Sequence, residues 1–385
     1  MKKFISLIAI GLVCSLPTMA QGTQTLKDVL GKHFDIGAAV DTTIVRGHDI
    51  RRTNLVKEQF NSIVAENCMK GEEIHPEENR YFWDDADKTV KFAQENGLNL
   101  TGHCLVWHSQ PPKWMFTDEK GAFVSRSVLI DRMYHHITTI VSRYRGKIKG
   151  WDVVNEAVND DGTMRQTPYY KIIGPDYIEL AFKFAHEADP NAELYINDYS
   201  MFKPGRRETI CRIVKELKAK GCRIDGIGMQ SHNGLEYPDL AEYEKSIDAF
   251  AACGVKVMIT ELDLNMLPNP KSFGGADISQ KYAFDKMMNP YPNGLDKAGQ
   301  KAFDDRYLAF FNIYNRHRSQ ISRITLWGVT DDFSWLNNWP IKGRTNYPLL
   351  FDRNYKAKPV VKKILKLFTS PAPSQGGECL AGHNK

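Results

Sequence analysis

The most informative segment of this chain runs from Lys149 to Ala157 and reads KGWDVVNEA. Its apolar residues predict a short buried strand, which ends in Asn155 and Glu156 just before a polar loop. A second segment, Val255–Asp263, reads VKVMITELD and places Glu261 where its apolar run ends. In a barrel of parallel strands, the carboxyl ends of the strands form the rim that carries catalytic groups. The two segments therefore predict two carboxylates at one rim, although either glutamate alone could simply cap its strand or pair with an arginine.

The same pattern of an apolar run, a polar loop and a longer helical segment recurs eight times along the chain. The expected strands are residues 35–41, 62–67, 98–107, 148–156, 193–199, 225–232, 255–264 and 324–331. The expected helices include residues 76–95, 127–145, 176–188, 206–220, 238–253, 297–319 and 359–368. This alternation predicts an α/β protein, a single (β/α)8 TIM barrel over residues 21–370 with its active site at the C-terminal rim of the strands. The rival fold is a doubly wound open sheet. It would normally carry a glycine-rich phosphate turn after the first strand, where this chain reads AAVDT.

The two ends of the chain differ in composition from the barrel. Two lysines precede an apolar run at residues 4–16 that is too short to span a bilayer, and small residues follow it. We therefore predict a signal peptide at residues 1–20 and a secreted or periplasmic protein with no membrane attachment after cleavage. An N-terminal membrane anchor is the alternative. Residues 371–385 contain Pro, Gly and Ser, and we expect them to form a disordered tail.

Charge and cysteine usage narrow the class of partner. Removal of residues 1–20 lowers the formal net charge from +5 to +3, a balance that argues against nucleic acid as a partner. Six cysteines then remain, without the spacing of a metal site: Cys68, Cys104, Cys211, Cys222, Cys253 and Cys379. We expect a monomer with no metal, no cofactor and at most one or two disulfides, whose pairing stays open.

Polar and aromatic residues gather at the carboxyl ends of the predicted strands. The polar ones are Glu66, Asn67, His103, Asn155, Glu156, Asn197, Asp198, Tyr199, Gln230, His232, Glu261, Asp263 and Asp331, and Trp107, Trp327 and Trp335 lie in the same segments. Charged and amide groups seldom finish buried strands without partners, so their coincidence predicts one shared polar cleft. Sugar rings stack on indoles while their hydroxyls bind amides and carboxylates. Any one of these tryptophans could be a core residue, but the set indicates a sugar-binding cleft.

Six motifs occur in order at these strand ends. They are ENCMK at 66–70, GHCLVWH at 102–108, WDVVNE at 151–156, GMQSH at 228–232, TELD at 260–263 and WGVTDDFSW at 327–335. Together they resemble glycoside hydrolase family 10, the endo-β-1,4-xylanases, from about residue 34 to residue 368. The resemblance implies a xylan-degrading hydrolase whose partners are xylan and xylo-oligosaccharides.

The resemblance also implies a role for each residue of the cleft. Glu156 would be the acid/base and Glu261 the nucleophile of a retaining double displacement, with Asn155 holding the sugar 2-hydroxyl. His232 and Asp263 would orient Glu261 and favour its ionised form. The residues that would line the glycone-side subsites are Glu66, Asn67, Lys70, His103, Trp107, Gln230, Trp327 and Trp335. In such an enzyme the two carboxyl groups lie about 5–5.5 Å apart. Burial and the charge of Glu261 should raise the pKa of Glu156.

The sequence departs from the family pattern at three points. Cys68 stands where a second acidic residue is usual, and residues 71–73 (GEE) replace an aromatic-led segment. The loop at residues 267–294 is longer than usual and could be a lid, a subsite wall or surface decoration. Taken alone, Lys70 could be solvated and His103 could be a core group. Rival functions are another retaining barrel glycosidase, such as a β-mannanase or cellulase, and a catalytically silent polysaccharide-binding protein.

Overall fold

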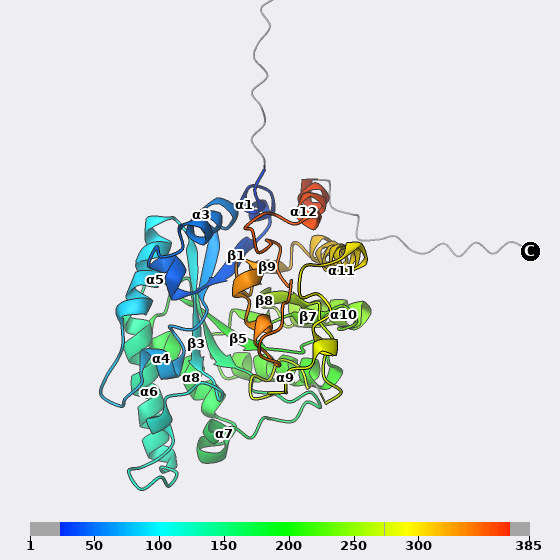
Figure 1. Ribbon diagram of the computed structural model, residues 1–385. Helices are drawn as coiled ribbons and strands as arrows, with labels where there is room; N and C mark the ends of the chain where they lie inside the picture. The colour runs from blue at the N-terminus through cyan, green and yellow to red at the C-terminus, as the bar shows by residue number, and fades with distance from the viewer. Residues whose placement is uncertain (1–23, 273, 370–385) are drawn as a thin grey trace, which may run out of the picture.

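Eight parallel strands close into a barrel in the computed structural model, which describes residues 24–272 and 274–369 (Figure 1). The strands are β1 (Asp35–Val40), β2 (Ser62–Ala65), β3 (Asn99–Val106), β4 (Gly150–Asn155), β5 (Glu193–Asp198), β6 (Gly226–Met229), β8 (Lys256–Asn265) and β9 (Ile321–Leu326). The ring closes because β9 pairs with β1 and β6 pairs with β8. A short extra strand, β7 (His232–Gly234), pairs with the rim end of β8. The predicted TIM barrel is confirmed.

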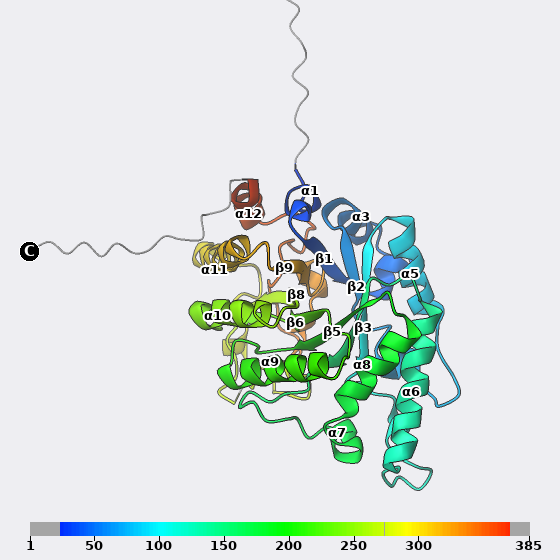
Figure 2. The same ribbon diagram turned by 180° about the vertical axis from the view of Figure 1, so that it is seen from behind.

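Helices surround the barrel on its outer side in both views (Figures 1 and 2). They are α1 (Leu26–Val29), α2 (Thr42–Val45), α3 (Ile50–Gln59), α4 (Gly71–Ile74), α5 (Asp84–Glu95), α6 (Arg126–Arg143), α7 (Pro168–Ile173), α8 (Tyr177–Ala188), α9 (Pro204–Ala219), α10 (Leu240–Ala251), α11 (Lys297–Arg316) and α12 (Pro359–Thr369). α8 illustrates why they pack: Ile178, Ala181, Phe182 and Ala185 are buried at helical spacing and form one apolar stripe. Truncation of Phe182 to alanine should cost about 3–5 kcal/mol of stability.

The barrel strands are buried on both faces, as expected for a parallel sheet covered by helices. Every residue of β4 is buried. Its Trp151 needs a glycine on the neighbouring strand, since a Cβ atom at Gly102 would lie 2.1 Å from the indole ring. Substitution of Gly102 would therefore push β3 and β4 apart close to the active site.

Three predicted elements differ clearly from the structure. The strand expected at 324–331 is β9, which begins at Ile321 and ends at Leu326. The strand expected at 225–232 is divided into β6 and β7, because Ser231 adopts a positive φ of 65° that breaks the extended conformation. The helix expected at 76–95 begins only at Asp84. The residues before it form an aromatic corner instead, in which Tyr81 stacks on His75 and on Trp83.

The ends of the described chain lie together, with α12 packed against α11 and α1 (Figure 1). The signal peptide and tail predictions fall outside the described residues. Within residues 24–272 and 274–369, no helix has the length and apolar character needed to cross a membrane. The cysteines of this part of the chain are all free: Cys68, Cys104, Cys211, Cys222 and Cys253.

Candidate active site

A single cleft at the carboxyl ends of the strands collects the predicted site residues. It is lined by Glu66, Asn67, Lys70, His103, Trp107, Gln110, Asn155, Glu156, Gln230, His232, Glu261, Ala276, Ile278, Trp327 and Trp335. All the predicted catalytic and sugar-contacting residues are in this set. Asp263 lies behind His232 and supports it from outside the cleft.

Glu156 follows the last residue of β4 in a left-handed backbone conformation, with φ of 59°. Its backbone N–H donates to the Asn197 carbonyl oxygen at 2.9 Å, which holds it against β5. Ser200 and Ser231 have φ of 46° and 65° just beyond β5 and β6. Positive φ is uncommon for residues other than glycine and persists where the surroundings enforce it. The ends of three adjacent strands are therefore strained at the point where they present side chains to the cleft.

The carboxyl group of Glu156 is poised to carry a proton at neutral pH. Burial raises its pKa to about 7, and the negative charge of Asp198 adds to the effect. Hydrogen bonds from Trp107 and Gln230 oppose the rise, and the charge of Glu261 makes a smaller contribution to it. Both effects expected from the sequence, burial and the charge of Glu261, raise the pKa, and Asp198 at the end of β5 adds a larger charge effect that was not expected.

Glu261, on β8, has the opposite character. Burial alone would raise its pKa, but hydrogen bonds from His232 and Asn197 and the charge of His103 hold the pKa below its ordinary value. Asn197 Nδ2 lies 2.8 Å from one carboxylate oxygen, and His232 Nε2 lies 3.2 Å from the other. Glu261 is thus ionised under conditions in which Glu156 is protonated.

His232, one of the two residues expected to support Glu261, lies between Glu261 and the other, Asp263. β7 pairs with β8 so that His232 lies opposite Asp263, and their Nδ1 and Oδ2 atoms are 3.0 Å apart. Burial would lower the pKa of His232, but Asp263 and Glu261 raise it to about 10. Trp335 Nε1 also donates to Asp263 Oδ2 at 2.8 Å. His232 is therefore a cation held between two carboxylates.

One hydrogen-bond network joins the two glutamates. Asn197 Nδ2, which donates to Glu261, also lies 2.9 Å from Asn155 Oδ1. Gln230 Nε2 donates to Asn155 Oδ1 at 3.3 Å and to Glu156 Oε1 at 3.1 Å. Both carboxylates therefore face one cavity, held by groups from four barrel strands.

The side of the cleft that was predicted to bind sugar is lined by Lys70, His103 and the tryptophans. Lys70 is only 6% exposed, donates to Asn67 Oδ1 at 2.9 Å, and its Nζ atom lies 5.1 Å from the Trp107 ring centre. His103 Nδ1 is 2.9 Å from Asp152 Oδ2, and its ring meets Trp327 edge to face at 5.3 Å. A solvated Lys70 is thereby excluded.

Other residues of the site were not predicted from the sequence. Asn197 was noted at a strand end but received no role, and Gln110, Ala276 and Ile278 were not assigned to the cleft. The amide of Asn197 at the end of a buried strand was the available signal. Asp331 is different: it turns away from the cleft and pairs with buried Lys358 at 2.8 Å.

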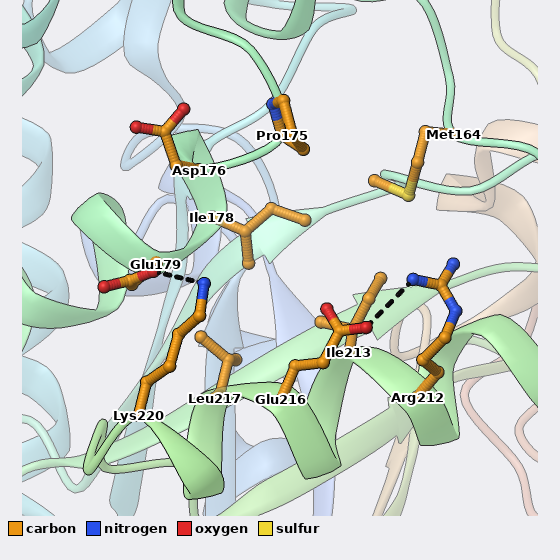
Figure 3. Close-up of a pocket in the computed structure, with 10 residues that line it drawn as sticks. All are labelled: Met164, Pro175, Asp176, Ile178, Glu179, Arg212, Ile213, Glu216, Leu217 and Lys220. Carbon is orange, nitrogen blue, oxygen red and sulfur yellow. Dashed lines mark hydrogen bonds and ion pairs between the residues drawn. The ribbon is translucent and has the colours of Figure 1, made fainter.

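A second pocket lies on the outside of the barrel, between α8 and α9 (Figure 3). Four of its charged groups form two ion pairs within the pocket, Glu179 with Lys220 and Arg212 with Glu216. It has no indole platform and no buried carboxyl pair. Among the described residues, no cluster of His, Cys, Asp or Glu could hold a metal ion.

Cleavage of a glycosidic bond with retention needs one carboxyl that holds a proton beside one that has lost it. The fold and the opposed pKa values of Glu156 and Glu261 thus define a glycoside hydrolase on a TIM barrel. Comparison with known proteins then gives the family. The chain belongs to glycosyl hydrolase family 10, whose sequence model matches residues 25–367. The resemblance drawn from the six motifs is confirmed.

Similar proteins have consistent descriptions. Endo-1,4-beta-xylanase A of Xylanibacter ruminicola is 63% identical over 353 residues, which cover 92% of this chain and 96% of the relative. The structure of a GH10 endoxylanase retrieved from a sugarcane soil metagenome is 43% identical, with a TM-score of 0.85 over 89% of this chain and 99% of that one. A mutant structure in complex with xylotriose is 33% identical, with a TM-score of 0.79 over the same shares.

Proposed function

We propose that the chain is a retaining endo-1,4-β-xylanase in which Glu156 is the acid/base and Glu261 the nucleophile. The observation that carries the assignment is the pair of opposed pKa shifts inside one hydrogen-bond network. Family membership and the xylanase relatives support xylan and xylo-oligosaccharides as the substrate.

In the first step, Glu261 attacks the anomeric carbon while Glu156 donates its proton to the departing glycosidic oxygen. The bond to the leaving sugar breaks as the bond to the Glu261 carboxylate forms. The ester that results carries no charge. The negative charge of Glu261, which helps to raise the pKa of Glu156, is therefore removed. Glu156 then accepts a proton from water, the water attacks the same carbon, and Glu261 departs as a carboxylate. Two inversions at one carbon give net retention.

The remaining residues of the cleft stabilise this charge cycle. Asn197 and His232 form hydrogen bonds to the Glu261 carboxylate before the attack. They stabilise the carboxylate again when Glu261 is released. Asn155 accepts a hydrogen bond from Asn197, and in this proposal it holds the sugar 2-hydroxyl beside the nucleophile, where bonds strengthen in the transition state. Trp107, Trp327 and Trp335 provide apolar faces for xylose rings.

Replacement of the nucleophile tests the assignment. Glu261→Ala should lose nearly all xylan turnover, and added azide should restore cleavage of an aryl β-xylobioside with inverted product, because azide enters from the vacated face. Glu216→Ala, in the outer pocket of Figure 3, removes a carboxylate of the same length and should leave turnover unchanged. Ordinary xylan cleavage by the Glu261→Ala protein would remove this residue from the role.

The acid/base is tested by the choice of leaving group. Glu156→Ala should slow xylan hydrolysis by about 10²–10⁴-fold, the usual contribution of a general acid. An aryl β-xylobioside with an activated leaving group needs little protonation, so a burst of released phenol should persist. If the activated substrate reacts no faster than xylan, Glu156 is not the acid. Activity measured on mannan, cellulose and xylan distinguishes the rival glycosidases. Release of reducing sugar from any of them excludes a catalytically silent binding protein.

We also infer export and a monomeric state. Two lysines, a short apolar run and small residues before Gln21 support removal of a signal peptide and a secreted or periplasmic location. Cell fractionation with N-terminal sequencing should give a mature protein that begins near residue 21. Light scattering should give the mass of one chain.

A further inference from the structure

The long loop at residues 267–294 is part of the cleft. Ala276 and Ile278 line the same cavity as Glu156 and Glu261. We call residues 275–278 the loop tip. Because two of its side chains line the cavity that holds the catalytic pair, surface decoration does not describe this part of the loop.

The predicted glycone residues other than Gln230 lie on or after β2, β3 and β9. The loop tip contacts residues that follow β4 and β5 instead. A Cβ atom at Gly275 would lie 3.2 Å from both the Tyr199 ring and Ser200 Oγ, so the tip packs directly against this part of the rim. The loop tip therefore packs on the part of the rim next to Glu156, which follows β4, and not on the strand ends that carry most of the predicted glycone residues.

Asp277 holds the loop tip in this position. Its Oδ2 atom is 4.0 Å from Arg165 Nη1, and Arg165 Nη2 donates to the Tyr199 hydroxyl at 2.6 Å. The other carboxylate oxygen accepts from the backbone N–H and the hydroxyl of Ser279, at 2.9 and 2.7 Å. One side chain thus closes the turn of the loop and docks it on the β4 side of the cleft.

The stem of the loop is braced as well. Gln280 accepts from Gly274 N at 3.0 Å and donates to the Gly275 carbonyl at 3.3 Å. Tyr282 N donates to the Pro340 carbonyl at 3.0 Å, which fixes the stem to the segment after β9. The loop therefore spans the rim between two supports and presents a defined surface to the cleft.

We propose that the loop tip is a wall of the aglycone side of the cleft, where it contacts the sugar that leaves with the Glu156 proton, and that Asp277 positions it. This inference rests on the proposed function. Ala276 and Ile278 offer an apolar surface that fits the C–H face of a xylose ring, which has no hydroxymethyl group. A leaving sugar that is held in place keeps its glycosidic oxygen within reach of Glu156.

Two substrates separate this role from a general structural one. When xylotetraose is cleaved, the leaving group is a sugar that touches the wall. When an aryl β-xylobioside is cleaved, the leaving group is a phenol, which cannot make the contacts of a sugar. Asp277→Ala should lower the ratio of kcat/KM for xylotetraose to kcat/KM for the aryl substrate on the order of tenfold, mainly through KM. Asp277→Asn should lower it less, since it still accepts from Ser279. Ile278→Ala shortens the wall without disturbing the turn and should move the ratio in the same direction.

Asp285 provides the matched control. It lies on the same loop and accepts from Met287 N at 2.8 Å, but Met287 is 81% exposed and neither residue lines the cavity. Asp285→Ala should leave the substrate ratio unchanged. Xylopentaose labelled at its reducing end reports which of its bonds is cut. In Asp277→Ala the position of the cut should shift away from bonds whose cleavage depends on contacts to the aglycone sugar.

The outcomes distinguish the inference from the proposed function. If the ratio of kcat/KM values is unchanged in both Asp277→Ala and Ile278→Ala, the proposal that the loop tip is an aglycone wall is wrong. An equal loss of kcat/KM on both substrates would also show that it is wrong. In either case, an inactive Glu261→Ala protein would leave the xylanase assignment intact. Xylan turnover by the Glu261→Ala protein would instead refute the assignment of Glu261 as the nucleophile, whatever the results for the loop variants. Thermal melting of each variant identifies any loss that comes from unfolding.

Discussion

The charge on His232 keeps the nucleophile ionised, and Asp263 keeps the charge on His232. Substitution Asp263→Asn removes the anion that lies 3.0 Å from His232 Nδ1, but an asparagine oxygen can still accept from Trp335 Nε1. Burial opposes the charge on His232, and after the substitution Glu261 is the carboxylate that still favours it, so the pKa of His232 should fall well below about 10. A larger fraction of His232 would then be neutral in the working pH range.

The size of the effect follows from the bond between His232 and Glu261, which is 3.2 Å long. A hydrogen bond to a charged group contributes about 1.5–3 kcal/mol; the pair of charged groups lies near the upper end of this range, and a neutral imidazole that donates to the carboxylate lies near the lower end. The loss is therefore on the order of 1–1.5 kcal/mol, or about one unit in the pKa of Glu261. The pKa of Glu261 is lowered in the native protein, so the variant should raise it. The acidic limb of the kcat/KM profile moves to higher pH by the same amount.

The assay is kcat/KM against pH on an aryl β-xylobioside for the native and Asp263→Asn proteins. Asp304→Asn is the control, because Asp304 is also a buried carboxylate paired with a lysine, Lys363 at 3.0 Å, but it lies on α11. The control should lose stability and keep its acidic limb in place. A uniform drop in activity for Asp263→Asn, with an unmoved acidic limb, would refute the link between the charge of His232 and the ionisation of Glu261.

Other expected outcomes concern the acid, the network and the core. Because burial raises the pKa of Glu156 to about 7, kcat/KM should fall as pH rises through about 7, and a falling limb near 4.5 would contradict the assignment. Asn197→Ala should reduce kcat by about tenfold or more while the protein stays folded, since it removes the 2.8 Å bond to Glu261; an unchanged kcat would remove Asn197 from the site. Lys358→Met should cost about 3–5 kcal/mol in urea denaturation by leaving Asp331 buried without its 2.8 Å partner, and a cost below that of the same change at an exposed lysine would show that Asp331 does not need the pair. A crystal structure should place the carboxyl groups of Glu156 and Glu261 about 5–5.5 Å apart, and a separation of about 6.5–9.5 Å would indicate inversion instead.

The sequence was sufficient for the strand order, the barrel and most of the cleft. Short apolar runs that end in polar residues are local patterns, and a parallel barrel brings every such end to the same rim. Glu156, Glu261 and the indoles could therefore be assigned to one cleft before any contact was known. Boundaries were less accurate where local backbone geometry intervened, as at Ser231, whose positive φ divides β6 from β7.

What the sequence determined by itself, then, is which side chains stand at the rim. Only the tertiary structure decided which of them act on one another. Asp198 outweighs Glu261 in raising the pKa of Glu156, and Asp331 turns away to Lys358 although it also follows a strand. The loop tip docks on Arg165, more than a hundred residues earlier in the chain. Charge interactions and hydrogen bonds depend on distance and burial in space, and spacing along a sequence fixes neither for residues on different strands.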